Sequence, residues 1–201
     1  MSGIHVNRRT FVAAAAVLAS GIATRPALAA TRSTSLFDIA AAGLRRHGGN
    51  VAVPDVVAIA DFAAPSAAPR FHLVDMATGS VESFLVAHGR GSDPDHSGWL
   101  RRFSNDPGSY CTSEGAYRTL DYYQGAHGRS MRLAGLDTTN DKAEARAIVI
   151  HSAKYVSTAI ARDTGVLGRS EGCFAVAEAD LPRVLQRMGP GRLLLAGRFG
   201  A

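Results

Sequence analysis

The chain has 201 residues, with 22 Lys and Arg against 17 Asp and Glu, and its net charge is +5. No run of basic residues accompanies this charge, so we expect no nucleic-acid groove. Two cysteines are too few for a disulfide framework, and a chain of this length can bury enough apolar surface to fold without one.

The first 29 residues have the composition of an export signal. Arg8 and Arg9 precede an Ala-rich apolar run at residues 11–22, and a small-residue stretch ends in Ala-Leu-Ala at 27–29. The context "NRRTFVA" is similar to a twin-arginine signal, and the alternative is an anchor that is not cleaved. We expect residues 1–29 to direct the protein to the periplasm or outside the cell, and residues 30–201 to form a single domain.

The rest of the chain predicts strands in the middle and helices towards the edges. Leu36, Ile39 and Leu44 recur at nearly helical spacing, which predicts an amphipathic helix. Residues 90–113 are rich in Gly, Ser, Asp, Pro and Asn and predict a long functional loop. The other expected elements are a strand at 53–65, a hairpin at 70–89, strands at 115–123, 130–136 and 146–152, helices at 155–165 and 177–188, and a strand at 191–199. The fold class is α+β, with a mainly antiparallel sheet or partly closed barrel and peripheral helices.

Cys173 and His151 are the candidate chemical pair. His151 ends the apolar strand "AIVI", where an imidazole can be held rigidly at a cleft, and Cys173 follows 22 residues later in "LGRSEGCF". Glycines before the cysteine let backbone N–H groups approach a reacting carbonyl, and a nearby imidazole can deprotonate the thiol. This pattern suits acyl transfer through a thioester. The alternatives are a buried structural thiol and a disulfide with Cys111, which would silence the enzyme.

The segment "HSAKYVS...GVLGRSEGCFAV" resembles the catalytic segment of the murein L,D-transpeptidase family, which has the YkuD-like fold. The ordered segments "VAHGRGS", "FSNDPGSYCTSEGAYRT", "RAIVIHSAKYVS" and "GRSEGCFA" resemble a proteobacterial branch with the segment Gly-Arg-Ser-x-Gly-Cys-x-Ala. Glu171, Phe174 and Ala175 depart from the usual His, Pro and Asn or Arg. The resemblance extends from about Ala52 to the C-terminus.

The resemblance implies a mechanism. Cys173 would attack the diaminopimelate carbonyl of a peptidoglycan stem peptide and expel the terminal D-alanine, with His151 as proton carrier. Ser152 would orient the imidazole, and the backbone N–H groups of Gly172 and Cys173 would bind the oxyanion. The neighbouring imidazolium of His151 would lower the pKa of the thiol. The acyl acceptor would be a diaminopimelate amine or an amine of a cell-wall-anchored protein.

Two other functions remain open. Water as acceptor would make the protein an L,D-carboxypeptidase or endopeptidase, and the choice depends on cleft shape and water exclusion. The departures at Glu171 and Ala175 motivate a non-catalytic cell-wall binding protein.

Five further residues are candidates for substrate binding. Arg169 and Arg90 could hold substrate carboxylates, although each could also be a solvated loop arginine. Ser170 belongs to the motif, His88 could sit in the cleft wall or be merely hydrogen-bonded, and Tyr117 lies in a strand expected to line the cleft, where it could simply pack. The other histidines lack metal-ligand spacing, so we expect no metal and no cofactor.

Overall fold

The computed structural model describes Met1 and residues 35–200. The expected export signal therefore lies, apart from Met1, outside the described residues. Within residues 35–200, none of the helices has the length and apolar character needed to cross a bilayer.

The described chain contains three α-helices and nine strands. The helices are α1 (Leu36–His47), α2 (Thr158–Thr164) and α3 (Leu181–Arg187). The strands are β1 (Val56–Asp61), β2 (Phe71–Asp75), β3 (Val81–Phe84), β4 (Val86–Ala87), β5 (Gly115–Gly125), β6 (Gly128–Gly135), β7 (Val149–Ser152), β8 (Phe174–Val176) and β9 (Leu193–Gly197).

All nine strands form one sheet in the order β3-β2-β1-β9-β5-β6-β7-β8-β4. The pairs β1–β9 and β7–β8 are parallel, and the other six pairs are antiparallel. The two edge strands, β3 and β4, are separated in the chain by Leu85 alone. The sheet must therefore curl until its edges meet at Leu85, yet β3 and β4 do not pair, so it is not closed into a barrel.

Helix α1 covers one face of the sheet. Its N-cap is Ser35, whose hydroxyl accepts the Asp38 N–H, and basic residues in its last turn complement the helix dipole. Every residue of β1 is buried because both faces of that strand are covered. Val57 and Ile59 point to the cluster that includes α1.

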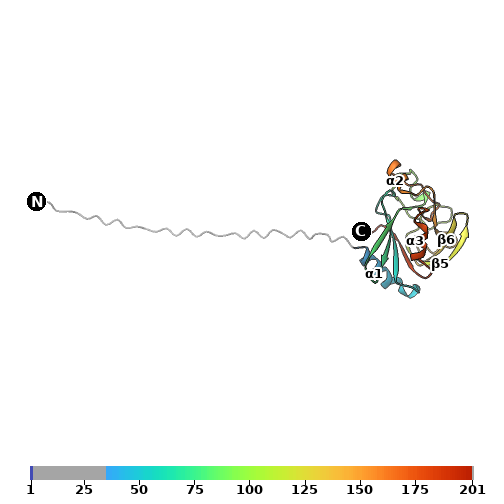
Figure 1. The fold of residues 1–201 in the computed structure, drawn as a ribbon, viewed down its shortest axis with the longest axis horizontal. Helices are drawn as coiled ribbons and strands as arrows, with labels where there is room; N and C mark the ends of the chain where they lie inside the picture. Colours follow the sequence, from blue (N-terminus) through green and yellow to red (C-terminus); the bar gives the residue numbers. More distant parts are fainter. Residues whose placement is uncertain (2–34, 201) are drawn as a thin grey trace. The chain divides into compact units, whose positions relative to one another are not determined.

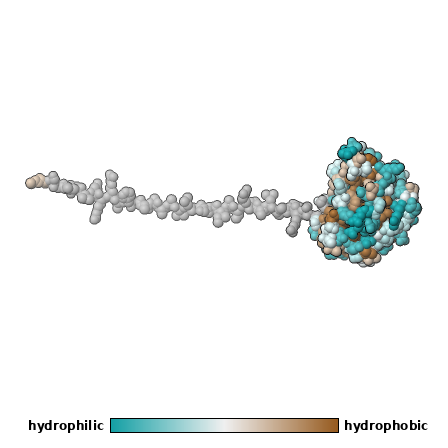
Figure 2. All heavy atoms as spheres, in the orientation of Figure 1, coloured by the Kyte–Doolittle hydropathy of each residue, from teal (hydrophilic) through white to brown (hydrophobic). Residues whose placement is uncertain are grey.

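Helix α3 lies against the opposite face. The alternate β1 residues Val56, Ala58 and Ala60 share the main core with Val184 and Leu185 of α3. Figure 1 shows α3 in front of the curled sheet and α1 at its lower edge. On the face of residues 35–200 seen in Figure 2, hydrophobic residues appear in small separate areas among hydrophilic ones, as expected when the apolar side chains are enclosed.

The fold class expected from the sequence is confirmed. The loop predicted at residues 90–113 contains only a short 3-10 turn, Arg90–Ser92, as regular structure. The second strand of the hairpin predicted at 70–89 is divided at Leu85 into β3 and β4. The short strand β8 was not predicted, because three residues give no readable periodicity. It matters for the site, since it begins directly after Cys173.

Candidate active site

Cys173 is presented by a tight turn at the start of β8. The Ser170 hydroxyl donates to the Cys173 carbonyl at 2.7 Å and accepts the Gly172 N–H at 3.1 Å. Gly172 has φ +124°, and a Cβ atom there would lie 2.7 Å from the Cys111 carbonyl oxygen. The turn therefore requires glycine at position 172 and uses the Ser170 side chain internally.

His151 stands on the adjacent strand, β7. The parallel pairing of β7 with β8 sets His151 opposite Ala175, two residues beyond Cys173. The imidazole Nδ1 lies 2.8 Å from the Ser152 carbonyl, which can only accept, so Nδ1 carries the proton. The neutral ring therefore keeps Nε2 as its unprotonated nitrogen.

Cys173 and His151 line the same pocket, which has a volume of about 630 Å³. Its other lining residues are Pro107, Gly108, Tyr110, Tyr123, Ala126, His127, Ala145, Arg146, Ala147, Val149, Tyr155, Arg169, Ser170 and Glu171. The Cys173 Sγ atom lies 3.5 Å from the Ala147 carbonyl. Within residues 35–200, no group of three or more His, Cys, Asp or Glu side chains is arranged to hold a metal.

Both members of the pair are biased towards their neutral forms. Burial lowers the pKa of His151, and the nearby His127 lowers it further, while the hydrogen bond to Ser152 acts in the opposite direction. Burial also raises the pKa of Cys173, although the Val149 N–H and the Arg146 charge oppose that rise. This corrects the expectation of a thiol whose pKa is lowered by a neighbouring imidazolium.

The cysteines do not form a disulfide. Cys111 and Cys173 are both free, Cys111 is fully buried, and its Sγ atom lies 3.5 Å from the Ser109 carbonyl. Cys111 contributes to the site through its backbone, which packs against Gly172.

The two candidate arginines differ in their position. Arg169 lines the pocket, and its guanidinium donates to the carbonyl oxygens of Asp93 and Pro94. Arg90 is exposed beside the pocket, where it stacks over Tyr110 at 3.7 Å and pairs with Glu171 at 3.1 Å.

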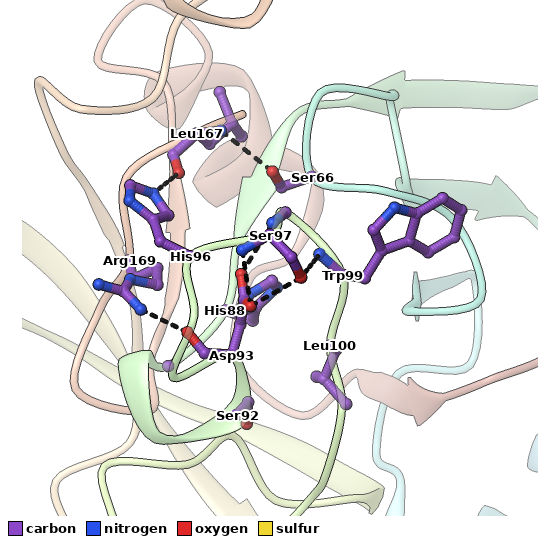
Figure 3. A network of polar contacts seen from close by, with 12 residues as sticks. Ser66, His88, Ser92, Asp93, His96, Ser97, Trp99, Leu100, Leu167 and Arg169 are labelled. Atoms are coloured by element: carbon purple, nitrogen blue, oxygen red, sulfur yellow. Dashed lines mark hydrogen bonds and ion pairs between the residues drawn. The ribbon is translucent and has the colours of Figure 1, made fainter. Parts of the chain in front are cut away.

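His88 and Tyr117 are not in the pocket lining. His88 is 1% exposed. Arg70 donates to its Nδ1 at 2.7 Å, and its Nε2 lies 3.4 Å from the Asp93 carboxylate. Figure 3 shows His88 beside Asp93, whose carboxylate also accepts bonds from Ser97. Tyr117 donates to the Ser113 carbonyl inside the core. Both side chains therefore lie away from the pocket that contains Cys173. Tyr117 is at an inward-facing position of β5, and His88 is held just after β4 by Arg70 and Asp93.

Several pocket residues were not predicted from the sequence, and three of them bear directly on the chemical pair. His127 sits in the β5–β6 turn and stacks on His151, and its position in "GAHG" between two predicted strands was the available signal. Tyr155 lines the pocket, and burial, with a smaller effect of Cys173, raises its pKa to about 12. Arg146 directly precedes the apolar strand that carries His151, and nothing in the local pattern distinguished it from a surface arginine.

Comparison with known proteins identifies the family. A family model described as L,D-transpeptidase catalytic domain matches residues 29–196. Similar solved structures include L,D-transpeptidase 3 from Mycobacterium tuberculosis (14% identity, TM-score 0.46, 71% of this chain and 61% of that one). An L,D-transpeptidase from Mycobacterium smegmatis (12%, 0.42, 71% and 58%) and the helical cell shape determining protein Pgp2 from Campylobacter jejuni (15%, 0.44, 78% and 53%) are also similar.

The matched region covers less than two thirds of each of these three structures. A search of curated proteins gave no match. The family model spans most of the chain, and on that basis the chain belongs to the L,D-transpeptidase catalytic domain family.

Proposed function

We propose that the protein is a cysteine-dependent acyltransferase that performs L,D-transpeptidation on peptidoglycan stem peptides. The observation that carries this proposal is the shared pocket of Cys173 and His151, in which Ser152 fixes the tautomer of the imidazole. This arrangement provides a nucleophile, a base and a group that orients the base.

The reaction begins with the neutral pair. His151 Nε2 takes the thiol proton as the Cys173 sulfur bonds to the donor carbonyl carbon, which forms a tetrahedral oxyanion. When that intermediate collapses, the bond to the leaving amine breaks, and the amine takes the proton from His151. The product is an acyl thioester on Cys173, and D-alanine leaves.

The second half repeats these steps with the acceptor. An acceptor amine attacks the thioester carbonyl, loses a proton to Nε2, and the thiolate departs and recovers that proton. The product is a new amide and a free Cys173 thiol. Water in place of the amine gives a carboxylic acid instead, which is carboxypeptidase action.

The two backbone N–H groups expected to bind the oxyanion do not have equal roles. The Gly172 N–H is already bonded to the Ser170 hydroxyl, whereas the Cys173 backbone lowers the pKa of its own thiol and so favours negative charge there. We assign the Cys173 N–H as the principal donor and Gly172 as the residue that allows the turn. Ser170 in this proposal holds the turn and does not bind substrate.

Arg169 is our candidate for binding a substrate carboxylate. Its guanidinium has backbone carbonyls as partners, so its charge is not neutralised by an acid within hydrogen-bond distance. Arg90 is the second candidate. To bind a substrate carboxylate it would have to break its exposed ion pair with Glu171, which costs little free energy.

The test is incubation with purified diaminopimelate-containing tetrapeptide muropeptides, followed by mass analysis. Transpeptidation gives cross-linked products that lack one D-alanine, while hydrolysis gives tripeptides only. Cys173→Ala is the matched inactive variant, and Cys111→Ser should retain turnover. Binding without any product would support the cell-wall binding alternative, and an added protein amine as acceptor would test anchoring of a cell-wall protein.

We also propose that the protein acts outside the cytoplasm. The support is the twin-arginine-like sequence around Arg8 and Arg9 and the Ala-Leu-Ala at 27–29. N-terminal sequencing of exported protein should find a start near Ala30, and exported protein that still carries Met1 would contradict cleavage.

A further inference from the structure

Arg146 lies in the turn before β7, half-buried in the wall of the pocket that contains Cys173. Its two terminal nitrogens bind one segment of the loop. The bonds run from Nη1 to Ser104 O (2.9 Å) and Ser113 Oγ (2.5 Å), and from Nη2 to Cys111 O (2.5 Å) and Ser109 Oγ (3.4 Å).

All four of these partners are neutral. They are two carbonyls and two hydroxyls, and no carboxylate of residues 35–200 forms an ion pair with Arg146. The hydrogen bonds solvate the guanidinium and fix its position, but they do not cancel its charge. In a partly buried site, that charge acts on other groups of the pocket more strongly than it would in water.

The group best placed to use this charge is the Cys173 turn. A Cβ atom on Gly172 would lie 3.2 Å from Arg146 Nη2, so the guanidinium abuts the residue that precedes the cysteine. Arg146 lowers the pKa of Cys173 against the larger effect of burial. His151 is buried and biased towards its neutral form.

We propose that Arg146 is a positioning residue, the fixed cation that stabilises the thiolate form of Cys173, so that the thiol can pass its proton to neutral His151 without an imidazolium already present beside the sulfur. This proposal deepens the proposed function and rests on it. It assigns separate tasks to two groups: Arg146 offsets the burial of the sulfur, and neutral His151 carries protons.

Other charged or titratable groups also face the sulfur. Glu171, on the same turn, raises the pKa of Cys173 and so opposes Arg146. The remaining ones that line the pocket are Arg169 from the same segment, His151 from β7, Tyr155 from the loop after β7, Tyr110 from the 104–113 loop, Tyr123 from β5 and His127 from the β5–β6 turn. Of the two pocket arginines, Arg146 is the one among the largest influences on the pKa of the Cys173 thiol.

The experiment measures ionisation of the thiol directly. The full-length chain is alkylated with iodoacetamide across a pH series, and the rate at Cys173 is followed by mass analysis of its peptide, which separates it from buried Cys111. The variants are Arg146→Gln, Arg146→Lys and His151→Ala. No peptidoglycan substrate is used, so the result does not depend on whether the proposed turnover is observed.

We expect Arg146→Gln to move the alkylation midpoint to higher pH and to slow alkylation about tenfold below the midpoint. Arg146→Lys should keep the midpoint, because it keeps the charge although it loses the forked hydrogen bonds. In His151→Ala, Cys173 should be alkylated no more than about twofold more slowly than in the unsubstituted protein.

Two results would overturn the proposal. One is an unchanged alkylation midpoint in folded Arg146→Gln. The other is a fall in the alkylation rate of His151→Ala as large as the tenfold fall expected for Arg146→Gln. If Arg146→Gln does not fold, as shown by the loss of its cooperative thermal transition, the other two variants test the proposal. A midpoint raised in Arg146→Lys, or in His151→Ala with Arg146 intact, would then refute the role.

Discussion

The imidazole rings of His127 and His151 stack with their centroids 4.2 Å apart and their planes 25° from parallel. His127 comes from the tip of the β5–β6 hairpin, far from β7 in the chain, and both side chains line the same pocket. The stack shields His151 from water and places a second titratable ring beside it, and both effects disfavour a charged His151.

The first prediction concerns His127→Ala. This change removes the neighbouring ring and admits water, so the pKa of His151 should rise. Because His151 accepts the thiol proton only when neutral, the acid limb of kcat/KM should move to higher pH. His127→Phe is the control that retains the stacked ring, and it should move the limb less. An acid limb that stays in place or moves to lower pH in His127→Ala would contradict this role.

The second prediction concerns covalent trapping by a carbapenem. The ring should open on the Cys173 sulfur and leave one drug mass on that residue, because the thiol faces the pocket beside a base. Cys111 is fully buried and should stay unmodified. Intact mass and peptide mapping of reduced, folded protein would measure this, and an adduct at Cys111 alone, or none at all, would argue against an active enzyme.

The third prediction compares two glycines. Gly172→Ala should lose about 2 kcal/mol or more of unfolding free energy, because its φ of +124° and a Cβ contact of 2.7 Å to a carbonyl both resist a side chain. Gly165→Ala has φ +74° but nothing within 4 Å of the added Cβ, so it should lose only about 1 kcal/mol.

Urea unfolding measures both effects, and thioester formation should fail only in the Gly172 variant. Equal losses of stability in the two variants would show that the close packing at Gly172 is not what the turn requires.

The fourth prediction concerns pH and stability. Burial, followed by the Arg70 charge, lowers the pKa of His88 to about 4 from its usual value near 6.5. Between these values the unfolded chain binds a proton that the folded protein does not. Stability should therefore fall as pH drops from about 6.5 to about 4, by on the order of 3 kcal/mol from this group.

His88→Gln tests this linkage without a titrating group. Its amide can accept from Arg70 and donate towards Asp93, so the variant should show a flatter dependence of unfolding free energy on pH in this window. Urea titrations at about pH 7 and pH 4.5 provide the comparison. The same slope in both proteins would show that His88 is not the group responsible.

The sequence by itself determined the α+β fold class, helix α1 and the β2–β3 hairpin, and it singled out Cys173 and His151 as the candidate chemical pair. These features depend on local patterns: helical spacing between capping residues, alternation in strands, and a short glycine-flanked motif. The sequence also predicted that Cys173 and His151 would lie together, and both line the same pocket.

Only the tertiary structure decided which neighbours complete the site. The parallel register of β7 and β8 brings Cys173 and His151 into one pocket, and that register depends on which faces of the strands are buried. Tertiary contacts also decided that Tyr117 faces the core from β5 and that His88 is buried against Arg70 and Asp93, although both lie in segments of the motif. His127 became a pocket residue because β6, which follows it, pairs with β7 and sets the hairpin tip beside His151. Arg146 became one because the turn before β7 packs on the 104–113 loop. Such contacts between distant segments leave no periodic trace in the sequence.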